Sequence, residues 1–305
     1  MRPAEGVATV GILGCGRMGS AMARAVHAAG HDLVIWNRTA AAADAVALEL
    51  GGRSVARPAD VAASADISIS MLADGVAVDA VYGGPDGLVA GARAGTVLVD
   101  SSTVPPAVLR GHESAIRARG AGVLDAPVSG SIALAESGKL TLMVGGEESD
   151  LDRARPALEA YGATIFHLGP LGTGAAMKLA VNTVIFGLNG ALAEGLVLAE
   201  RAGIARDRAY DVLAESAVGA PYLGYKRAAF LDPDGTPVGF SADLAAKDLQ
   251  LIADLARSLD QDIPQAATNL AVIEAVIAAE GGDVDFSAVA SHLRDRHVKE
   301  VGATG

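Results

Sequence analysis

Cysteine, aromatic residues and positive charge are all scarce in this sequence of 305 residues. The single cysteine, Cys15, excludes an internal disulfide, so nothing in the composition points to an oxidising compartment. Aromatic residues make up only 4% of the chain while 37 residues are glycine, which indicates packing through small side chains. The formal charge of −12 argues against partners such as nucleic acid or an anionic membrane surface, because both need a basic face.

We expect no export signal, and the sequence has no long uninterrupted apolar run. Residues Met1–Glu5 lead directly into a strand-like segment, without the apolar core of a signal peptide. The most membrane-like stretch, Leu179–Ala199, is interrupted by Asn182, Asn189 and Glu194, which favours a helix buried in protein. Since 51% of the residues are hydrophobic and 20% are charged, we expect a folded globular protein, and the single cysteine leads us to expect a cytoplasmic location.

The first half of the chain alternates short β-rich runs with alanine-rich helical stretches. Helices are predicted over Gly19–Ala29 and Ala40–Glu49, among others. The predicted strands are Thr9–Leu13, Leu33–Trp36, Ile67–Met71, Val97–Asp100, Gly122–Asp125, Leu140–Val144 and Thr164–Phe166. Apolar strands joined by helical crossovers predict a parallel sheet covered on both faces, and hence an α/β fold with a Rossmann-type, doubly wound N-terminal domain.

The pattern changes at a glycine-rich segment that begins near residue 168. A long linking helix is predicted from about Ala175 to Ala202, and no convincing β-run follows Phe166. Later helices are predicted over Arg206–Glu215, Ala242–Leu259 and Ala266–Glu280. We therefore divide the chain into a nucleotide-binding domain at 1–168 and an all-α substrate and dimerisation domain at 169–305.

A glycine-rich loop follows the first predicted strand. Gly14, Gly16 and Gly19 form the pattern G-x-G-x-x-G ahead of a helix, which is typical of dinucleotide sites. The first glycine permits a tight turn, the second lets the backbone approach a pyrophosphate, and the third allows close helix–strand packing. The alternative is a glycine-rich turn without a ligand. The loop residues predicted to bind the cofactor are Gly14, Cys15, Gly16, Arg17 and Met18.

The residues after the second strand bear on the choice of nucleotide. NAD sites usually place a carboxylate about 20 residues beyond the glycines, where this chain has Asn37. Arg38 can pair with a 2′-phosphate and Thr39 can donate a hydrogen bond to it. We therefore predict NADP(H) as the preferred cofactor, with NAD(H) possible; a solvated surface arginine is the alternative.

Ser129, Gly130 and Ser131 follow the predicted strand Gly122–Asp125. Ligands of open α/β sheets bind at the carboxyl ends of strands, and this turn offers N–H groups and hydroxyls that suit a carboxylate. An ordinary Ser-Gly turn is the alternative interpretation.

Lys178 and Asn182 lie four residues apart at the start of the long predicted helix. They share one helix face among apolar neighbours, where burial lowers a lysine pKa toward the range useful for proton transfer. A snorkelling surface lysine is the alternative. In a later helix, Lys247 is positioned to reach a cofactor with Asp248 beside it, unless the two form only a solvated charge pair.

No metal site is predicted, since one cysteine and six scattered histidines show no ligand spacing. The histidines are His27, His31, His112, His167, His292 and His297. No G-x-S-x-G elbow occurs either, which removes a serine-hydrolase interpretation.

Taken in order, these segments resemble the β-hydroxyacid dehydrogenase family over nearly the whole chain. The matching segments are Gly14–Gly19, Asp100–Pro105, Asp125–Gly130, Gly172–Asn182 and Lys247–Leu249. The family includes 3-hydroxyisobutyrate dehydrogenases, tartronate semialdehyde reductases and glyoxylate/succinic semialdehyde reductases. The resemblance implies reversible hydride transfer between NAD(P)(H) and a small carboxylate-bearing carbonyl compound or hydroxy acid.

The same resemblance implies roles for individual residues. Lys178 matches the catalytic general acid and base, Asn182 its companion, and Ser129 with Gly130 the carboxylate-binding turn. Further cofactor contacts are implied at Met71, Leu72, Thr103 and Lys247. The resemblance also implies a homodimer or homotetramer formed through the helical domain.

Two features narrow the comparison: the residue after Gly130, and the segment Asn37-Arg38-Thr39, which fits the NADPH-using branches better than the NAD-using 3-hydroxyisobutyrate enzymes. Many members carry Gly-Gly after the serine, whereas this chain has Gly130-Ser131, as do the glyoxylate/succinic semialdehyde reductases and the related imine reductases. Imine reductases usually have Asp or Tyr where this chain has Lys178, so carbonyl reduction is favoured. An imine reductase and a noncatalytic NADPH-binding regulator remain as alternatives.

Overall fold

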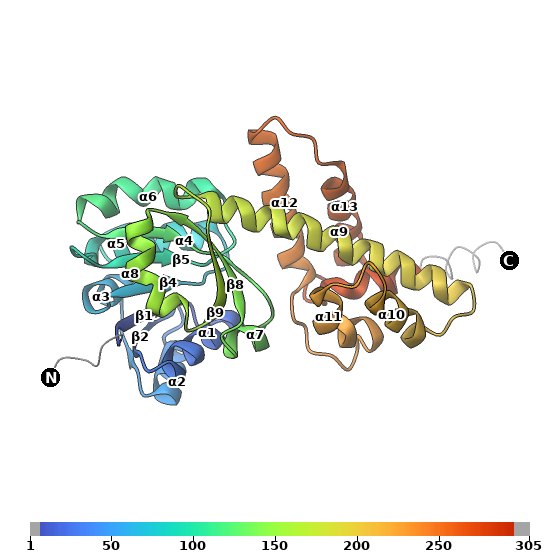
Figure 1. Cartoon of the computed structure of the whole chain (residues 1–305), viewed down its shortest axis with the longest axis horizontal. Coiled ribbons are helices and arrows are strands. Elements are labelled where there is room, and N and C mark those ends of the chain that lie inside the picture. The colour runs from blue at the N-terminus through green and yellow to red at the C-terminus, as the bar shows by residue number, and fades with distance from the viewer. Residues whose placement is uncertain (1–6, 296–305) are drawn as a thin grey trace. The chain divides into compact units, whose positions relative to one another are not determined.

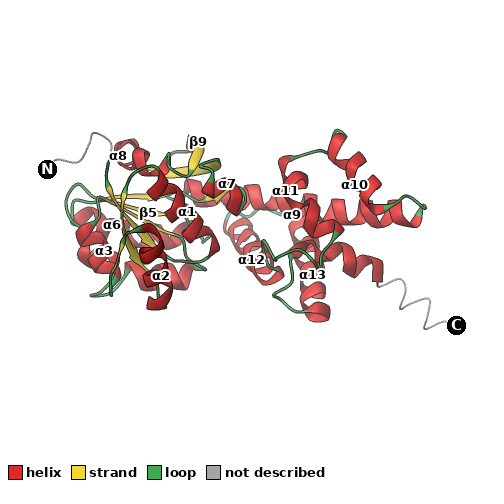
Figure 2. Ribbon diagram, turned by 90° about the horizontal axis from the view of Figure 1, so that it is seen from below, coloured by secondary structure: helices red, strands yellow, loops and turns green. Residues whose placement is uncertain are grey.

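The computed structural model describes residues 7–295, and they form two compact units that divide between Lys178 and Leu179. The first unit combines a sheet with helices, and the second consists of helices and loops (Figure 1; Figure 2). The division lies inside one continuous helix, α9 (Thr173–Arg201), which therefore belongs to both units. Our domain division at residues 168 and 169 stays a prediction.

The first unit is a mostly parallel sheet, as the sequence predicts, with strand order β3-β2-β1-β4-β5-β6-β8-β7 and with β9 also paired to β8. Its strands are β1 (Thr9–Leu13), β2 (Asp32–Trp36), β3 (Arg53–Ser54), β4 (Ile67–Ser70), β5 (Val97–Asp100), β6 (Gly122–Asp125), β7 (Val128–Ser129), β8 (Leu140–Gly146) and β9 (Gly162–His167). Its helices are α1 (Arg17–Ala28), α2 (Ala40–Leu50), α3 (Pro58–Ser64), α4 (Gly75–Tyr82), α5 (Leu88–Gly91), α6 (Pro106–Ala118), α7 (Ile132–Glu136) and α8 (Glu148–Leu158).

One strand departs from the parallel arrangement of the sheet. β8 runs antiparallel to both β6 and β7, although β9 pairs with it in parallel. β8 returns after the short helix α7 alone, and antiparallel neighbours need only such short connections, whereas a parallel neighbour needs a long crossover. The apolar pattern of Leu140–Val144 is the same for either direction, so hydropathy did not reveal the reversal.

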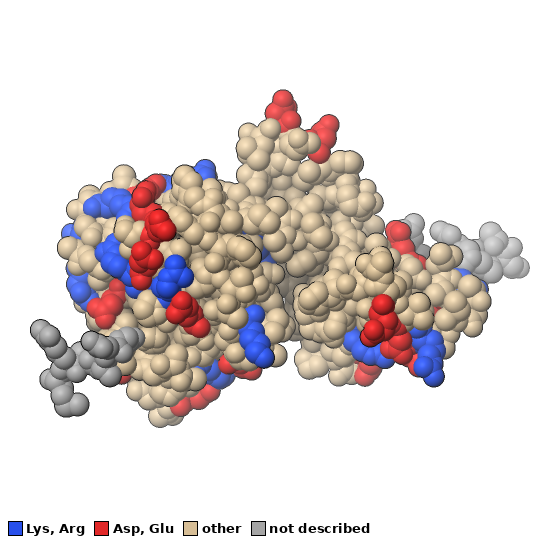
Figure 3. Space-filling model, viewed as in Figure 1, with Lys and Arg blue, Asp and Glu red and all other residues tan. Residues whose placement is uncertain are grey.

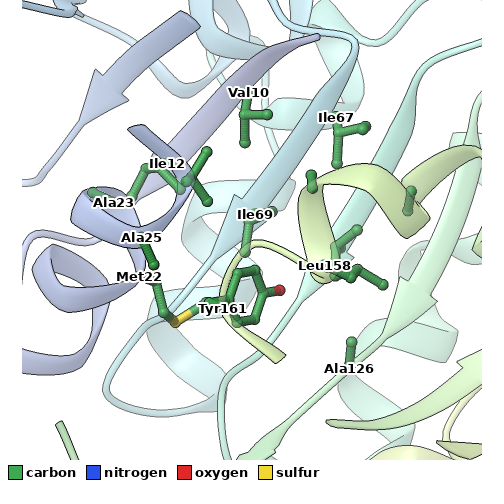
Figure 4. Close-up of a cluster of buried hydrophobic side chains, with 14 of the residues drawn as sticks. Val10, Ile12, Met22, Ala23, Ala25, Ile67, Ile69, Ala126, Leu158 and Tyr161 are labelled. Carbon is green, nitrogen blue, oxygen red and sulfur yellow. The ribbon is translucent and has the colours of Figure 1, made fainter. Parts of the chain in front are cut away.

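Apolar side chains cover both faces of the sheet because alternate strand residues point to opposite sides. On one face, Val10, Ile12 and Ile69 pack with Met22 of α1 and with residues of α2 and α8. Figure 4 shows Ile12, Met22, Ile69 and Tyr161 gathered in this cluster. Leu13 and Leu98 belong instead to the second cluster, with α3, α4, α5 and α6. The two buried layers hold the carboxyl ends of the strands in fixed positions.

The second unit is all helical over the residues described, as predicted, apart from one isolated β-bridge between Ser241 and Asp285. Its remaining elements are α10 (Arg206–Glu215), α11 (Pro221–Leu231), α12 (Ala242–Ser258), α13 (Pro264–Glu280) and the short 3₁₀ helix η1 (Phe286–Ala288). Its core joins Leu179 and Phe186 of α9 with Tyr222, Leu249 and Phe286. This packing fixes the helix face that carries Asn182.

Helix α9 meets its predicted burial only in part. It is long and apolar enough to cross a membrane by length and composition alone. Of the 18-residue apolar stretch within it that meets these criteria, 33% is buried inside the chain. Leu179 and Leu192 are buried, whereas Val184 is 70% exposed and Leu198 is 72% exposed. Two buried asparagines, Asn182 and Asn189, interrupt its apolar sequence.

Candidate active site

The glycine loop between β1 and α1 has the geometry that a dinucleotide needs. Gly14 has φ +105°, and a β-carbon added there would lie 2.2 Å from the Met71 carbonyl oxygen, so only glycine fits. A β-carbon on Gly19 would lie 2.0 Å from the Gly14 carbonyl oxygen, so this glycine allows α1 to approach the loop closely. These two roles agree with the sequence analysis.

The middle glycine leaves the start of α1 accessible. Gly16 precedes the helix without a side-chain cap, and a β-carbon added there would meet nothing within 4 Å. Arg17 is exposed and Met18 is half-buried beside it. Uncapped N–H groups at a helix start suit a pyrophosphate, so the loop fits the nucleotide that the motif implies.

Asn37 supports this loop from the end of β2. Its Oδ1 accepts a hydrogen bond from the Cys15 backbone N–H at 3.0 Å, and its Nδ2 donates to the Thr39 carbonyl oxygen at 3.0 Å. Both ends of the amide are therefore engaged within the loop, a role that the sequence did not reveal. Arg38 and Thr39 are exposed, and the Thr39 hydroxyl does not cap α2, so both are open to a ligand.

The thiol of Cys15 is half-buried in the same loop. Burial raises its pKa to about 11. Because the thiolate is the reactive form, this residue is unreactive near neutral pH. Cys15 therefore contributes to the loop through its backbone N–H.

Buried hydrogen bonds tie the ends of β4 and β5 together beside the loop. The Ser70 and Ser102 hydroxyls both donate to Asp100 Oδ1 at 2.7 Å, and Ser102 Oγ accepts from the Leu72 N–H at 2.8 Å. Burial raises the pKa of Asp100 to about 6. Met71, Leu72 and Thr103, the predicted cofactor contacts, are half-buried along this edge of the sheet.

The predicted carboxylate turn lies at the end of the short strand β7. Ser129 and Gly130 are half-buried, and Gly130 has φ +141°. Ser131 is the N-cap of α7, where its hydroxyl oxygen accepts from the Leu134 N–H at 3.3 Å. Its side chain therefore serves the helix, so Ser129 is the better-placed hydroxyl for a substrate.

The predicted catalytic pair lies one turn apart on α9. Lys178 is half-buried and Asn182 is 5% exposed. Asn182 Nδ2 donates to Asp248 Oδ2 on α12 at 2.8 Å, and the other oxygen of Asp248 lies 3.0 Å from Lys247 Nζ. Asp248 thus fixes the amide of Asn182. The two residues are 66 positions apart, so spacing in the sequence could not reveal this contact. The Lys247–Asp248 pair is not a solvated one, since Asp248 is 2% exposed.

Charged residues of both signs intermix on the face seen in Figure 3. Attraction for anionic ligands must therefore be local, despite the net charge of −12. Among residues 7–295, no cluster of His, Cys, Asp and Glu could hold a metal ion. His297 lies outside the described residues.

Both halves of the chain match known protein families. Residues 9–169 match the NAD binding domain of 6-phosphogluconate dehydrogenase, and residues 172–293 match the family described as NAD-binding of NADP-dependent 3-hydroxyisobutyrate dehydrogenase. The chain belongs to the β-hydroxyacid dehydrogenase family. As a family member, it is an NAD(P)-dependent oxidoreductase.

Individual family members are similar over nearly their whole length. A probable 3-hydroxyisobutyrate dehydrogenase of Mycobacterium bovis is 36% identical, with 94% of this chain and 98% of that protein covered. Glyoxylate/succinic semialdehyde reductase 2 of Arabidopsis thaliana is 34% identical, with 97% and 82% covered. The structure of Mycobacterium tuberculosis 3-hydroxyisobutyrate dehydrogenase with L-serine is 33% identical, has a TM-score of 0.80 and covers 94% and 99%. Solved imine reductases, such as one from Myxococcus stipitatus at 21% identity and TM-score 0.61, share the fold alone.

Proposed function

We propose that this protein reduces a small carboxylate-bearing aldehyde or ketone with NADPH, and oxidises the matching hydroxy acid in reverse. The observation that carries the proposal is the pair Lys178 and Asn182 on one turn of α9, with the Asn182 amide held by a buried carboxylate. A lysine that only covers surface needs no fixed polar companion. Names of relatives, which refer to semialdehydes and hydroxy acids, support the substrate class.

Each residue has one task in the proposed reaction. NADPH, when bound, supplies the hydride. Lys178 gives a proton to the carbonyl oxygen in reduction and takes it back in oxidation, a contribution of about 10²–10⁴-fold. Asn182 orients the substrate oxygen, and Ser129 with the Gly130 N–H holds the carboxylate.

The preference for NADPH over NADH rests on the loop after β2. Arg38 is exposed, and the Asn37 amide is engaged with the glycine loop, so no carboxylate stands ready for a ribose 2′-hydroxyl. Arg38→Asp should reverse the ratio of kcat/KM values for NADPH and NADH. An unchanged ratio would exclude Arg38 from the 2′-phosphate site.

Helix α9 supports a homodimer or homotetramer formed through the helical unit. Its exposed Val184 and Leu198 lie on a helix of which only a third of the apolar window is buried. Within this unit, a cavity of about 330 Å³ opens between α9 and α13, lined by Gly187, Asn269 and Val272 among others. A second copy would cover this surface, and sedimentation of wild type against Val184→Asp tests the assignment. A cytoplasmic location remains our proposal from composition.

The decisive assay is NADPH oxidation with short aldehyde acids, keto acids and cyclic imines. We expect turnover with glyoxylate, succinic semialdehyde or a related acid, and loss of turnover in Lys178→Met with NADPH binding preserved. Faster turnover of imines would identify an imine reductase, and nucleotide binding without any turnover would identify a regulator. Retained turnover in Lys178→Met would refute the acid–base role.

A further inference from the structure

A buried carboxylate at the end of β6 holds the beginning of the catalytic helix. Asp125 is 3% exposed, and its two oxygens accept from different backbone groups. Oδ1 accepts from the Gly172 N–H and Oδ2 from the Ala175 N–H, each at 2.6 Å. These bonds join segments 47 and 50 residues apart, all within the first unit.

Helix α9 has no capping side chain at Gly172, the residue before its first turn. Gly172 has φ +93° and lacks a side chain, while the Thr173 hydroxyl donates to the Pro170 carbonyl oxygen at 2.8 Å. The first N–H groups of a helix have no partner within the helix, and an N-cap carboxylate normally satisfies one of them. Asp125 performs this task from a distant strand and adds a negative charge at the positive end of the helix dipole.

Close contacts leave the helix start little freedom to shift. A β-carbon on Gly174 would lie 2.2 Å from the Met143 carbonyl oxygen and 2.9 Å from the Asp125 carbonyl oxygen, so α9 touches the backbone of β8 and β6. On another side, Arg110 Nε donates to the Leu171 carbonyl oxygen at 2.7 Å. Among these three hydrogen bonds, the carboxylate acceptor is that of Asp125.

From this geometry we infer that Asp125 is a positioning residue for Lys178. Lys178 follows Ala175 by three residues, so the two lie on neighbouring turns of one helix face. If the helical register of α9 shifted by one residue at its start, the Lys178 side chain would be rotated by about 100° around the helix axis. The expected effect of Asp125 on turnover rests on the proposed acid–base role of Lys178. The expected effect on the position of the Lys178 amine does not.

The test combines kinetics with a direct signal from the amine. The sequence has five lysines, so reductive ¹³C-methylation gives few NMR resonances, and a Lys178→Arg variant assigns the one needed. In Asp125→Asn, an NH2 group replaces one of the two carboxylate oxygens, so a donor faces a backbone N–H donor of α9. We expect a shifted Lys178 resonance and a kcat lower by about 10²-fold, since a displacement near 1 Å costs that much. The KM for NADPH should stay within about twofold, because the substitution leaves the residues that bind NADPH unchanged.

Asp150 of α8 offers a matched control, because it is a second buried carboxylate that binds β6. It is 1% exposed, and its carboxylate accepts from the Val123 N–H at 3.1 Å near the beginning of β6, away from α9. Asp150→Asn should lower the Tm while leaving the Lys178 resonance in place. If Asp125→Asn is poorly folded, Asp125→Glu keeps both acceptor oxygens and should give an intermediate shift.

The outcomes separate the two proposals. A Lys178 resonance that stays in place in folded Asp125→Asn or Asp125→Glu overturns the positioning inference. Equal shifts in Asp125→Asn and Asp150→Asn overturn it too, because they would show a general loss of structure. Turnover that survives in Lys178→Met refutes the proposed acid–base role, while a Lys178 resonance shifted only by changes at Asp125 still supports the positioning.

Discussion

Asp100 is the residue whose replacement gives the clearest test of the site's electrostatics. It ends β5, is 1% exposed, and accepts hydrogen bonds from two serine hydroxyls through Oδ1. Burial raises its pKa from 3.8 to about 6, and the bonds from Ser70 and Ser102 oppose that rise. The folded chain therefore holds this proton more tightly than the unfolded chain does.

The sign of the pH effect follows from this difference. Where the folded state binds more protons than the unfolded state, stability falls as pH rises, so Asp100 costs stability progressively between about pH 4 and pH 6. The difference between the two pKa values corresponds to about 3 kcal/mol. Asp100→Asn retains Oδ1 and does not titrate. Its unfolding free energy, measured relative to wild type, should therefore improve by about 2 kcal/mol between pH 4 and pH 7, because the carboxyl of the unfolded chain is already about half ionised at pH 4.

Urea unfolding at several pH values, followed by tryptophan fluorescence, measures this change. Trp36 is the only tryptophan in the sequence and lies on β2 in the same unit as Asp100. Asp152→Asn removes an exposed carboxylate and serves as the control. A difference for Asp100→Asn that changes by less than about 0.5 kcal/mol, the usual size of surface effects, would refute the reasoning.

Three further predictions concern the loop, the helical unit and the catalytic pair. Gly14→Ala should lower the Tm and weaken NADPH binding in a fluorescence titration, because its β-carbon meets the Met71 carbonyl oxygen. Gly16→Ala should fold with an unchanged Tm, so equal Tm values for the two variants would contradict this. Lys226→Met should cost about 3 kcal/mol in hydrogen-exchange stability at pH 7, since it leaves the nearly buried Asp285 carboxylate with backbone N–H donors but without its cation. Although burial raises the pKa of Asp285, Lys226 lowers it below its usual value, so the cost should shrink below about pH 4, and a constant cost would count against the pair. Asp248→Asn should lower kcat with nucleotide binding kept, because Asn182 loses its carboxylate acceptor, and an unchanged kcat would remove that role.

Local patterns in the sequence predicted much of the fold and of the nucleotide loop. Strand, glycine loop and helix follow one another within a few residues, so steric rules apply to them directly: Gly14 takes the positive φ that its place in the motif requires. The direction of β8 could not be predicted in this way, because apolar alternation has no polarity along the chain.

Contacts between distant residues were beyond sequence reasoning. Lys226 and Asp285 form a nearly buried ion pair at 2.7 Å across 59 residues, and neither stands in a recognisable motif. Asp125 was recognised only as part of the segment before Ser129, since its partners are backbone N–H groups of a turn that no side-chain pattern marks. The role of Asn37 was interpreted from what its side chain lacks, whereas the structure shows what its amide binds.

The double hydrogen bonding of Asn37 has a consequence for redesign of cofactor preference. An acidic residue at position 37 would still accept from the Cys15 N–H, but it would have no hydrogen to offer the Thr39 carbonyl oxygen and would repel it. Replacing Asn37 with an acidic residue, the change expected to favour NAD, would therefore do more than alter the charge. It would also loosen the segment that leads to α2. Engineering is better directed at Arg38, which is exposed and can be exchanged without disturbing the loop.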